Sequence, residues 1–179
     1  MNFSQEKVLA NINKKELAWF LTLASLAILI PIFIHVQWFA GPMVNAIFVV
    51  TLFLLGVRRA LAIAIVPSLI ALSSGTLPAV LAPAVPFIMI SNIIYILSIN
   101  YICANFSNKE KGYWQGILLG SSLKFVFLFL SSGFIIKIFT SETVAVKIGQ
   151  MMTWTQFATA VMGGMIAWIV LRYARSINN

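Results

Sequence analysis

Acidic residues are almost absent from this chain of 179 residues, which contains no aspartate. Its only side-chain carboxylates belong to Glu6, Glu16, Glu110 and Glu142. Carboxylate pairs for acid–base catalysis and oxygen-rich cation sites are therefore disfavoured. The single cysteine, Cys103, excludes an internal disulfide, and with the single histidine, His35, it cannot complete a zinc site.

Motifs of catalysis are missing as well. The chain has no G-x-x-x-x-G-K-[ST] loop, no dinucleotide-binding glycine pattern, no H-E-x-x-H and no nucleophile elbow. We therefore expect no enzymatic activity, no metal and no cofactor. The acidic relay typical of proton- or sodium-coupled carriers is also missing, so any transport would draw its energy from another subunit.

Apolar residues dominate what is present. Hydrophobic residues make up 61% of the chain and charged residues only 9%, which predicts an all-α integral membrane protein with a single domain over residues 1–179. A membrane-spanning helix needs about 20 apolar residues, so the chain has room for at most about six. Six apolar stretches between about residues 17 and 173 predict a bundle of six transmembrane helices: Leu17–Ile34, Pro42–Leu55, Ala60–Leu72, Pro78–Ile102, Tyr113–Phe139 and Val144–Tyr173.

Two boundaries need comment. The second and third stretches are separated only by Gly56-Val57-Arg58-Arg59, and we treat them as two helices because a merged helix would carry the arginine pair into the membrane. Residues 1–15 are polar and lack a cleavage site after a short apolar core. They predict a retained cytoplasmic segment and not a signal peptide.

Positive charge is distributed unevenly along the chain, whose net charge is +8. With the N-terminus inside, nine of the twelve Lys and Arg residues fall in cytoplasmic segments: Lys7, Lys14, Lys15, Arg58, Arg59, Lys109, Lys111, Arg172 and Arg175. The positive-inside rule therefore predicts a multi-pass plasma-membrane protein with both termini cytoplasmic. Because the charges flank apolar stretches, we expect anionic lipid and not nucleic acid as their partner.

Small residues recur at fourfold spacing in three stretches, a pattern that lets membrane helices approach closely. The three series are Ala60, Ala64 and Ser68; Gly112, Gly116 and Gly120; and Thr155, Thr159, Gly163 and Ala167. Either packing within this chain or docking to a partner subunit explains them. Prolines interrupt the third stretch at Pro67 and cluster at Pro78, Pro83 and Pro86, which favours bent or partly broken helices that face protein or a cavity.

Lys124 is the most informative single residue. It lies twelve positions into the fifth apolar stretch, near the middle of the hydrocarbon core, where a lysine costs several kcal/mol unless it is solvated or paired. No acidic residue is expected at that depth. The ammonium either hydrogen-bonds to carbonyls freed by the prolines or snorkels, or it binds an anionic or carbonyl-bearing ligand in a pocket.

Other polar and aromatic residues are expected in the outer half of the same bundle. Gln37 and Trp38, with His35, fall in the first outer loop, and Asn45 lies just inside the second stretch. Further candidates are Asn92 and Tyr95 on one face of the fourth stretch, and Gln150 and Trp154 on one face of the sixth. Together with Lys124 they predict a small-molecule cavity open to the outside.

Several short motifs resemble the substrate-binding S components of energy-coupling factor (ECF) transporters. They are Gly41-Pro42-Met43-Val44-Asn45-Ala46, Pro67–Leu72, Gly75-Thr76-Leu77-Pro78, Pro83-Ala84-Val85-Pro86-Phe87 and Asn92-Ile93-Ile94-Tyr95. The resemblance covers about residues 17–173. It implies capture of a vitamin-like micronutrient outside the cell, and delivery by toppling in the bilayer with a transmembrane coupling subunit and two ABC ATPases.

The resemblance also implies a docking surface for the coupling subunit. S components commonly carry an Ala-x-x-x-Ala motif on the first helix, and the nearest equivalent here is Ala18-x-x-x-Thr22. We expect the Ala60, Ala64 and Ser68 series to share this role.

Two other functions stay open at this stage, a non-transporting membrane scaffold of a cell-wall elongation type complex and a stand-alone small permease or channel. The scaffold explains the small-residue series but gives no reason for Lys124, Asn92 and Asn45 inside the membrane. For a transported ligand, the absence of buried carboxylates disfavours a permanent cation, and Lys124 favours a carboxylate, phosphate or polarised carbonyl.

Overall fold

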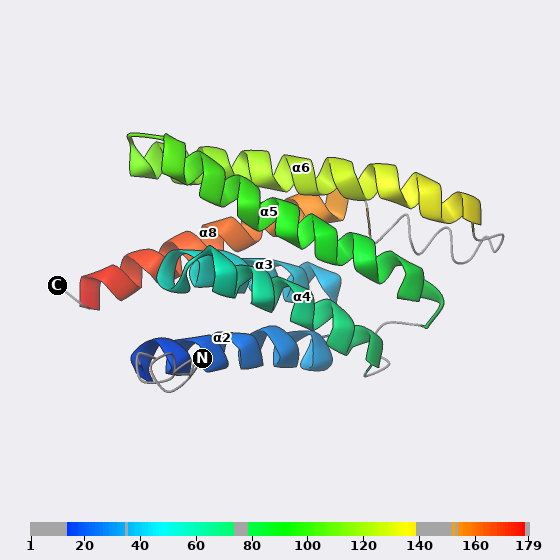
Figure 1. Cartoon of the computed structure of the whole chain (residues 1–179), viewed down its shortest axis with the longest axis horizontal. Helices are drawn as coiled ribbons and strands as arrows, with labels where there is room; N and C mark the ends of the chain where they lie inside the picture. The colour runs from blue at the N-terminus through cyan, green and yellow to red at the C-terminus, as the bar shows by residue number, and fades with distance from the viewer. Residues whose placement is uncertain (1–13, 35, 74–78, 139–151, 153, 178–179) are drawn as a thin grey trace, which may run out of the picture.

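The computed structural model describes residues 14–34, 36–73, 79–138, 152 and 154–177, and within them it has six α-helices, one short 3₁₀ helix and no strand (Figure 1). The helices are α2 (Lys14–Phe33), α3 (Gln37–Leu55), α4 (Val57–Ser73), α5 (Val85–Asn105), α6 (Lys109–Ile138) and α8 (Trp154–Ile177), and the 3₁₀ helix η1 covers Ala79–Ala84. The predicted all-α bundle is confirmed. Five of the described segments are long and apolar enough to cross a membrane, and α4, with 17 residues, is the shortest of the six helices.

The predicted separation of the second and third helices is confirmed at Gly56. This residue has φ 88°, a conformation that costs glycine little because it has no Cβ. Its N–H still donates to the Leu52 carbonyl at 3.1 Å and its carbonyl accepts from Ala60 N–H at 3.2 Å. The chain therefore turns within one residue, and Arg58 and Arg59 stay at the end of the bundle.

Proline positions explain the start of α5. The predicted fourth helix began at Pro78, which lies outside the described residues, but the described chain first forms η1, which contains Pro83. The α-helix begins at Val85 with Pro86 in its first turn, where a missing N–H costs no intrahelical hydrogen bond. The expected partly broken helix is therefore a 3₁₀ segment followed by α5.

Two of the small-residue series pack helices together within the chain. A Cβ added to Gly163 of α8 would lie 2.8 Å from the Pro42 carbonyl oxygen of α3, and one added to Gly120 of α6 would lie 3.1 Å from the Tyr95 carbonyl oxygen of α5. Figure 1 shows α5 beside α6 along most of their length. Close backbone approach thus joins α3 to α8 and α5 to α6.

The docking role predicted for the series Ala60, Ala64 and Ser68 needs correction. Ala60 and Ala64 are both fully buried in the core of this chain, and Ser68 lines a pocket inside the bundle. Ala60 and Ala64 therefore face neighbouring helices and leave no surface for a partner. Ala18 and Thr22 are exposed on α2, a helix in which only Leu23 and Ala27 are buried.

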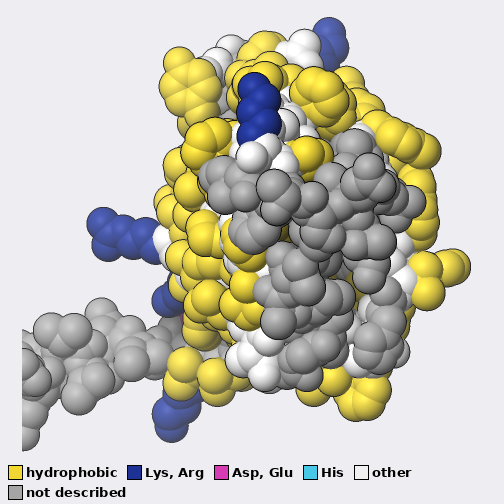
Figure 2. Space-filling view, turned by 90° about the vertical axis from the view of Figure 1, so that its right-hand side faces the viewer, with side chains coloured by type: hydrophobic (Ala, Val, Ile, Leu, Met, Phe, Trp, Pro, Cys, Tyr) yellow, Lys and Arg dark blue, Asp and Glu magenta, His cyan; other side chains and the backbone are white. Residues whose placement is uncertain are grey.

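Successive helices run in opposite directions, so most of the described Lys and Arg residues lie at one end of the bundle, at the left of Figure 1, and Lys124 and Lys137 lie further along α6. We call that left-hand end the basic end; it holds Lys14, Lys15, Arg58, Arg59, Lys109, Lys111 and Arg172. An ion pair of 2.6 Å between Glu16 and Arg59 joins α2 to α4 there. Figure 2 views the opposite end and shows hydrophobic side chains along the flanks. Leu130 and Ile169, both 67% exposed, belong to this lipid-facing surface.

Candidate functional site

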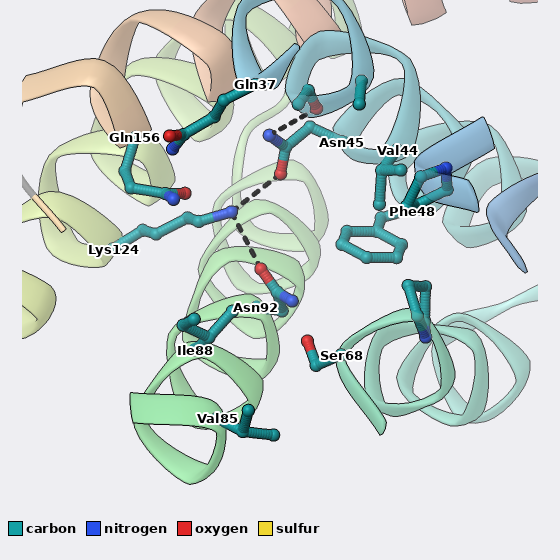
Figure 3. A pocket seen from close by; sticks show the side chains of 14 residues that line it. Gln37, Val44, Asn45, Phe48, Ser68, Val85, Ile88, Asn92, Lys124 and Gln156 are labelled. Carbon is teal, nitrogen blue, oxygen red and sulfur yellow. Dashed lines mark hydrogen bonds between the residues drawn. The ribbon is translucent and has the colours of Figure 1, made fainter. Parts of the chain in front are cut away.

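A cavity of about 190 Å³ lies in the half of the bundle away from the basic end. Its walls come from all six α-helices, with Pro31 as the contribution of α2 (Figure 3). The residues that line it are Pro31, Gln37, Ala40, Gly41, Val44, Asn45, Phe48, Pro67, Ser68, Val85, Ile88, Asn92, Lys124 and Gln156. Apolar walls with a few polar groups are typical of a small-molecule site.

Lys124 is the centre of the polar groups in this cavity. It lies fifteen residues after Lys109 in α6, about 22 Å along the helix at 1.5 Å per residue, and is only 2% exposed. Its Nζ donates to Asn45 Oδ1 and to Asn92 Oδ1, both at 2.8 Å. Two hydrogen bonds from a buried amino group offset part of its desolvation cost, so Lys124 is held in place by α3 and α5.

Each asparagine is in turn oriented by its own amide donor. Asn45 Nδ2 donates to the Gly41 carbonyl at 2.9 Å, one turn back in α3. Asn92 Nδ2 donates to the Ala64 carbonyl of α4 at 3.3 Å. Because both nitrogens face carbonyl oxygens, both Oδ1 atoms face Lys124. The network therefore connects α3, α4, α5 and α6 around one amino group.

The ring of Tyr95 contacts the Lys124 amino group, but Tyr95 does not line the cavity. Its ring centroid lies 5.5 Å from Lys124 Nζ, within the range of a cation–π contact. The fully buried Tyr95 hydroxyl donates to the Ala160 carbonyl of α8 at 2.9 Å. The predicted site residue Tyr95 is thus part of the scaffold behind the cavity.

The structure brings together four of the eight predicted site residues as cavity walls: Gln37, Asn45, Asn92 and Lys124. Trp38 and Trp154 do not line it; their rings pair with centroids 5.2 Å apart, and 42% and 62% of these residues is exposed. Gln150, like His35, lies outside the described residues.

The placement of Gln37 and Trp38 in a loop was wrong. Both belong to the first turn of α3, which begins after Val36 in an extended conformation. Sequence reasoning also missed Gln156, whose amide lies near the Gln37 amide and the Lys124 amino group in Figure 3. Its signal was present, because Gln156 precedes Thr159 by three residues and Gly163 by seven, on the helical face that packs against α3.

The cavity offers a defined set of interactions. Among the described residues, Lys124 Nζ makes two hydrogen bonds, whereas a protonated lysine has three donors. Figure 3 shows the amide and amino groups on one side and Phe48 and Val44 on the other. The arrangement suits a small ligand that has an anionic or carbonyl oxygen at one end and an apolar part at the other.

Comparison of the chain with protein-family models, curated proteins and solved structures finds no match.

Proposed function

We propose that this chain is the substrate-binding membrane subunit of an ECF-type transporter, which captures a small micronutrient for uptake driven by partner ATPases. The observation that carries the proposal is the cavity around Lys124. Lys124, Asn45 and Asn92 are buried, yet all three line a cavity of about 190 Å³. A scaffold protein has no need of such a cavity.

The cavity also narrows the class of substrate. Its volume is below the roughly 300–1,000 Å³ of sites for drug-sized ligands, so the ligand is small. Among the described residues that line it, none carries a carboxylate, which disfavours a cationic ligand. A carboxylate or polarised carbonyl can accept the third donor of Lys124, and Phe48 can cover a ring or apolar tail. A carboxylated heterocycle of vitamin size meets both requirements.

The coupling module supplies the energy in this proposal, since the sequence has no ATP-binding loop. The exposed Ala18 and Thr22 on α2 offer small side chains to a partner helix. Ala64 is no longer a candidate for this contact because it is fully buried.

Uptake by cells tests the proposal. Cells that express the chain with an ECF coupling subunit and its two ATPases should accumulate the ligand, and cells that express either part alone should not. Ala18→Trp should reduce accumulation and recovery of the complex while ligand binding is retained. Accumulation by the isolated chain would instead identify a stand-alone permease, and absence of any bound ligand would favour the scaffold.

A further inference from the structure

A second and larger cavity lies at the basic end, far from Lys124. It has a volume of about 640 Å³ and is lined by the ends of α3, α5 and α8 and the start of α6. Figure 1 shows α6 and α8 diverging toward this end. The cavity occupies the space where these helices separate.

Antiparallel pairing of α6 with α8 explains why a cavity forms there. Further from the basic end, the two helices are in close contact: a Cβ added to Gly164 would lie 2.6 Å from the Ile117 side chain. Four residues nearer the end, the rings of Tyr113 and Trp168 face each other with centroids 4.8 Å apart. Tyr113, Trp168 and Phe53, whose ring lies 5.3 Å from that of Tyr113, form the floor of the cavity. These large rings hold the helices apart.

The next four-residue step brings Lys109 and Arg172 to opposite walls of the cavity. Two cations that face one another repel. No ion pair between Glu110 and either Lys109 or Arg172 is found among the described residues, although Glu110 lines the same cavity. The cavity therefore combines an aromatic floor with an excess of positive charge at its rim.

We propose that this cavity binds the phosphate headgroup of one anionic phospholipid, with the phosphate between Lys109 and Arg172. Basic pockets between transmembrane helices bind such headgroups, and the concentration of Lys and Arg at this end is what the positive-inside rule predicts for the leaflet rich in anionic lipid. Arginine binds phosphate oxygens in a bidentate manner. The apolar floor and the lipid-facing flanks favour a lipid over a soluble phosphate. The site is independent of the ligand cavity at Lys124.

Native mass spectrometry of protein extracted from vesicles of phosphatidylcholine and phosphatidylglycerol tests the proposal. The wild-type chain should retain one phosphatidylglycerol. Arg172→Gln and Lys109→Gln should each reduce retention about fivefold, which corresponds to about 1 kcal/mol per cation. Both should unfold in lipid-free detergent no earlier than the wild type, because each removes a repulsion. Glu110→Gln should increase retention.

Arg58→Gln is the matched control, since it removes one positive charge from the same end without altering the cavity wall. Equal loss of phosphatidylglycerol in Arg58→Gln and Arg172→Gln would overturn the proposal, because general surface attraction would then explain binding. Retention of phosphatidylcholine as strongly as phosphatidylglycerol would overturn it too. In a second arm, glycerol phosphate and inorganic phosphate should not displace the lipid at millimolar concentration, and displacement would identify a site for soluble phosphate instead.

Discussion

Gly163 of α8 lies so close to Asn45 of α3 that a Cβ on Gly163 would stand 2.6 Å from the Asn45 Cβ. The small-residue series of α8 therefore positions a side chain that holds Lys124. The packing of α3 against α8 and the polar site are therefore coupled. A substitution that disturbs this packing should also alter ligand binding at Lys124.

Gly163→Ala should destabilise the protein by about 1–3 kcal/mol, because the added methyl group overlaps the backbone of α3. It should also weaken ligand binding through displacement of Asn45. Gly133→Ala is the control, since a Cβ there has nothing within 4 Å, and should be neutral or stabilising by up to about 1 kcal/mol. Thermal unfolding in detergent compares the two variants, and equal melting temperatures would show that α3 and α8 are not closely packed.

Lys124→Met should also destabilise the protein, by about 1–3 kcal/mol per acceptor left without a donor. Removal of a buried charge by itself would stabilise the protein, because it relieves the desolvation of the ammonium. The structure changes the sign, since Asn45 Oδ1 and Asn92 Oδ1 both lose their donor in this variant. Chemical unfolding of the purified proteins measures the difference, and a variant more stable than the wild type would mean that the two amides repack.

Two tyrosines hydrogen-bond to the backbone of α8, and each hydrogen bond should contribute about 1 kcal/mol to the free energy of unfolding. Tyr95 donates to the Ala160 carbonyl, and Tyr113 donates to the Gly164 carbonyl at 2.6 Å, one turn further along α8. Replacement by phenylalanine removes only the hydroxyl and leaves a buried carbonyl with one partner fewer. Unfolding of Tyr95→Phe and Tyr113→Phe should show losses of about 0.5–1.5 kcal/mol each. Unchanged stability in both would show that these hydroxyls do not hold the bundle together.

Orientation in the membrane can be tested at two exposed serines. Ser107 lies at the basic end and Ser73 ends α4 at the other. In a Cys103→Ser background, an impermeant thiol reagent added to intact cells should label Ser73→Cys but not Ser107→Cys. Labelling of both after the cells are opened is the control for access. The reverse result in intact cells would place the basic end outside.

Much of the fold could be predicted from the sequence because the membrane imposes a strong pattern. The lengths of the apolar stretches predicted the helices. Gly56 with Arg58 and Arg59 predicted the turn between α3 and α4. The site was predicted only in part. Polar residues at membrane depth pointed to Asn45, Asn92 and Lys124, but a one-dimensional pattern does not show which polar groups satisfy one another. The asparagine oxygens, and not proline-freed carbonyls, hold the lysine.

Side-chain direction also limited what the sequence could show. Ala60 and Ala64 have the spacing of a docking surface, yet the same spacing serves packing inside the bundle, where they are buried. Trp38 and Trp154 are close in sequence to the cavity residues Gln37 and Gln156, but their side chains are partly exposed and their rings pair with each other. Both outcomes depend on the neighbours of each helix, which only the assembled bundle defines.

Capture of an anionic ligand at Lys124 is the central claim, and Asn92→Asp tests it most directly. The change is nearly isosteric and places a carboxylate beside Lys124 Nζ, while the hydrogen bond that it gives up, Asn92 Nδ2 to Ala64, is long at 3.3 Å. We therefore expect the fold to persist. Asn105→Asp adds the same charge at an exposed position of α5 and is the matched control.

Native mass spectrometry of the purified proteins should detect one small ligand on the wild type and on Asn105→Asp. It should detect none, or at least about tenfold less, on Asn92→Asp, because the new carboxylate neutralises Lys124 and repels an anion. Retention of the same ligand by Asn92→Asp at the wild-type level would contradict the account, since the lysine would then be a structural group and not the binding group of the cavity.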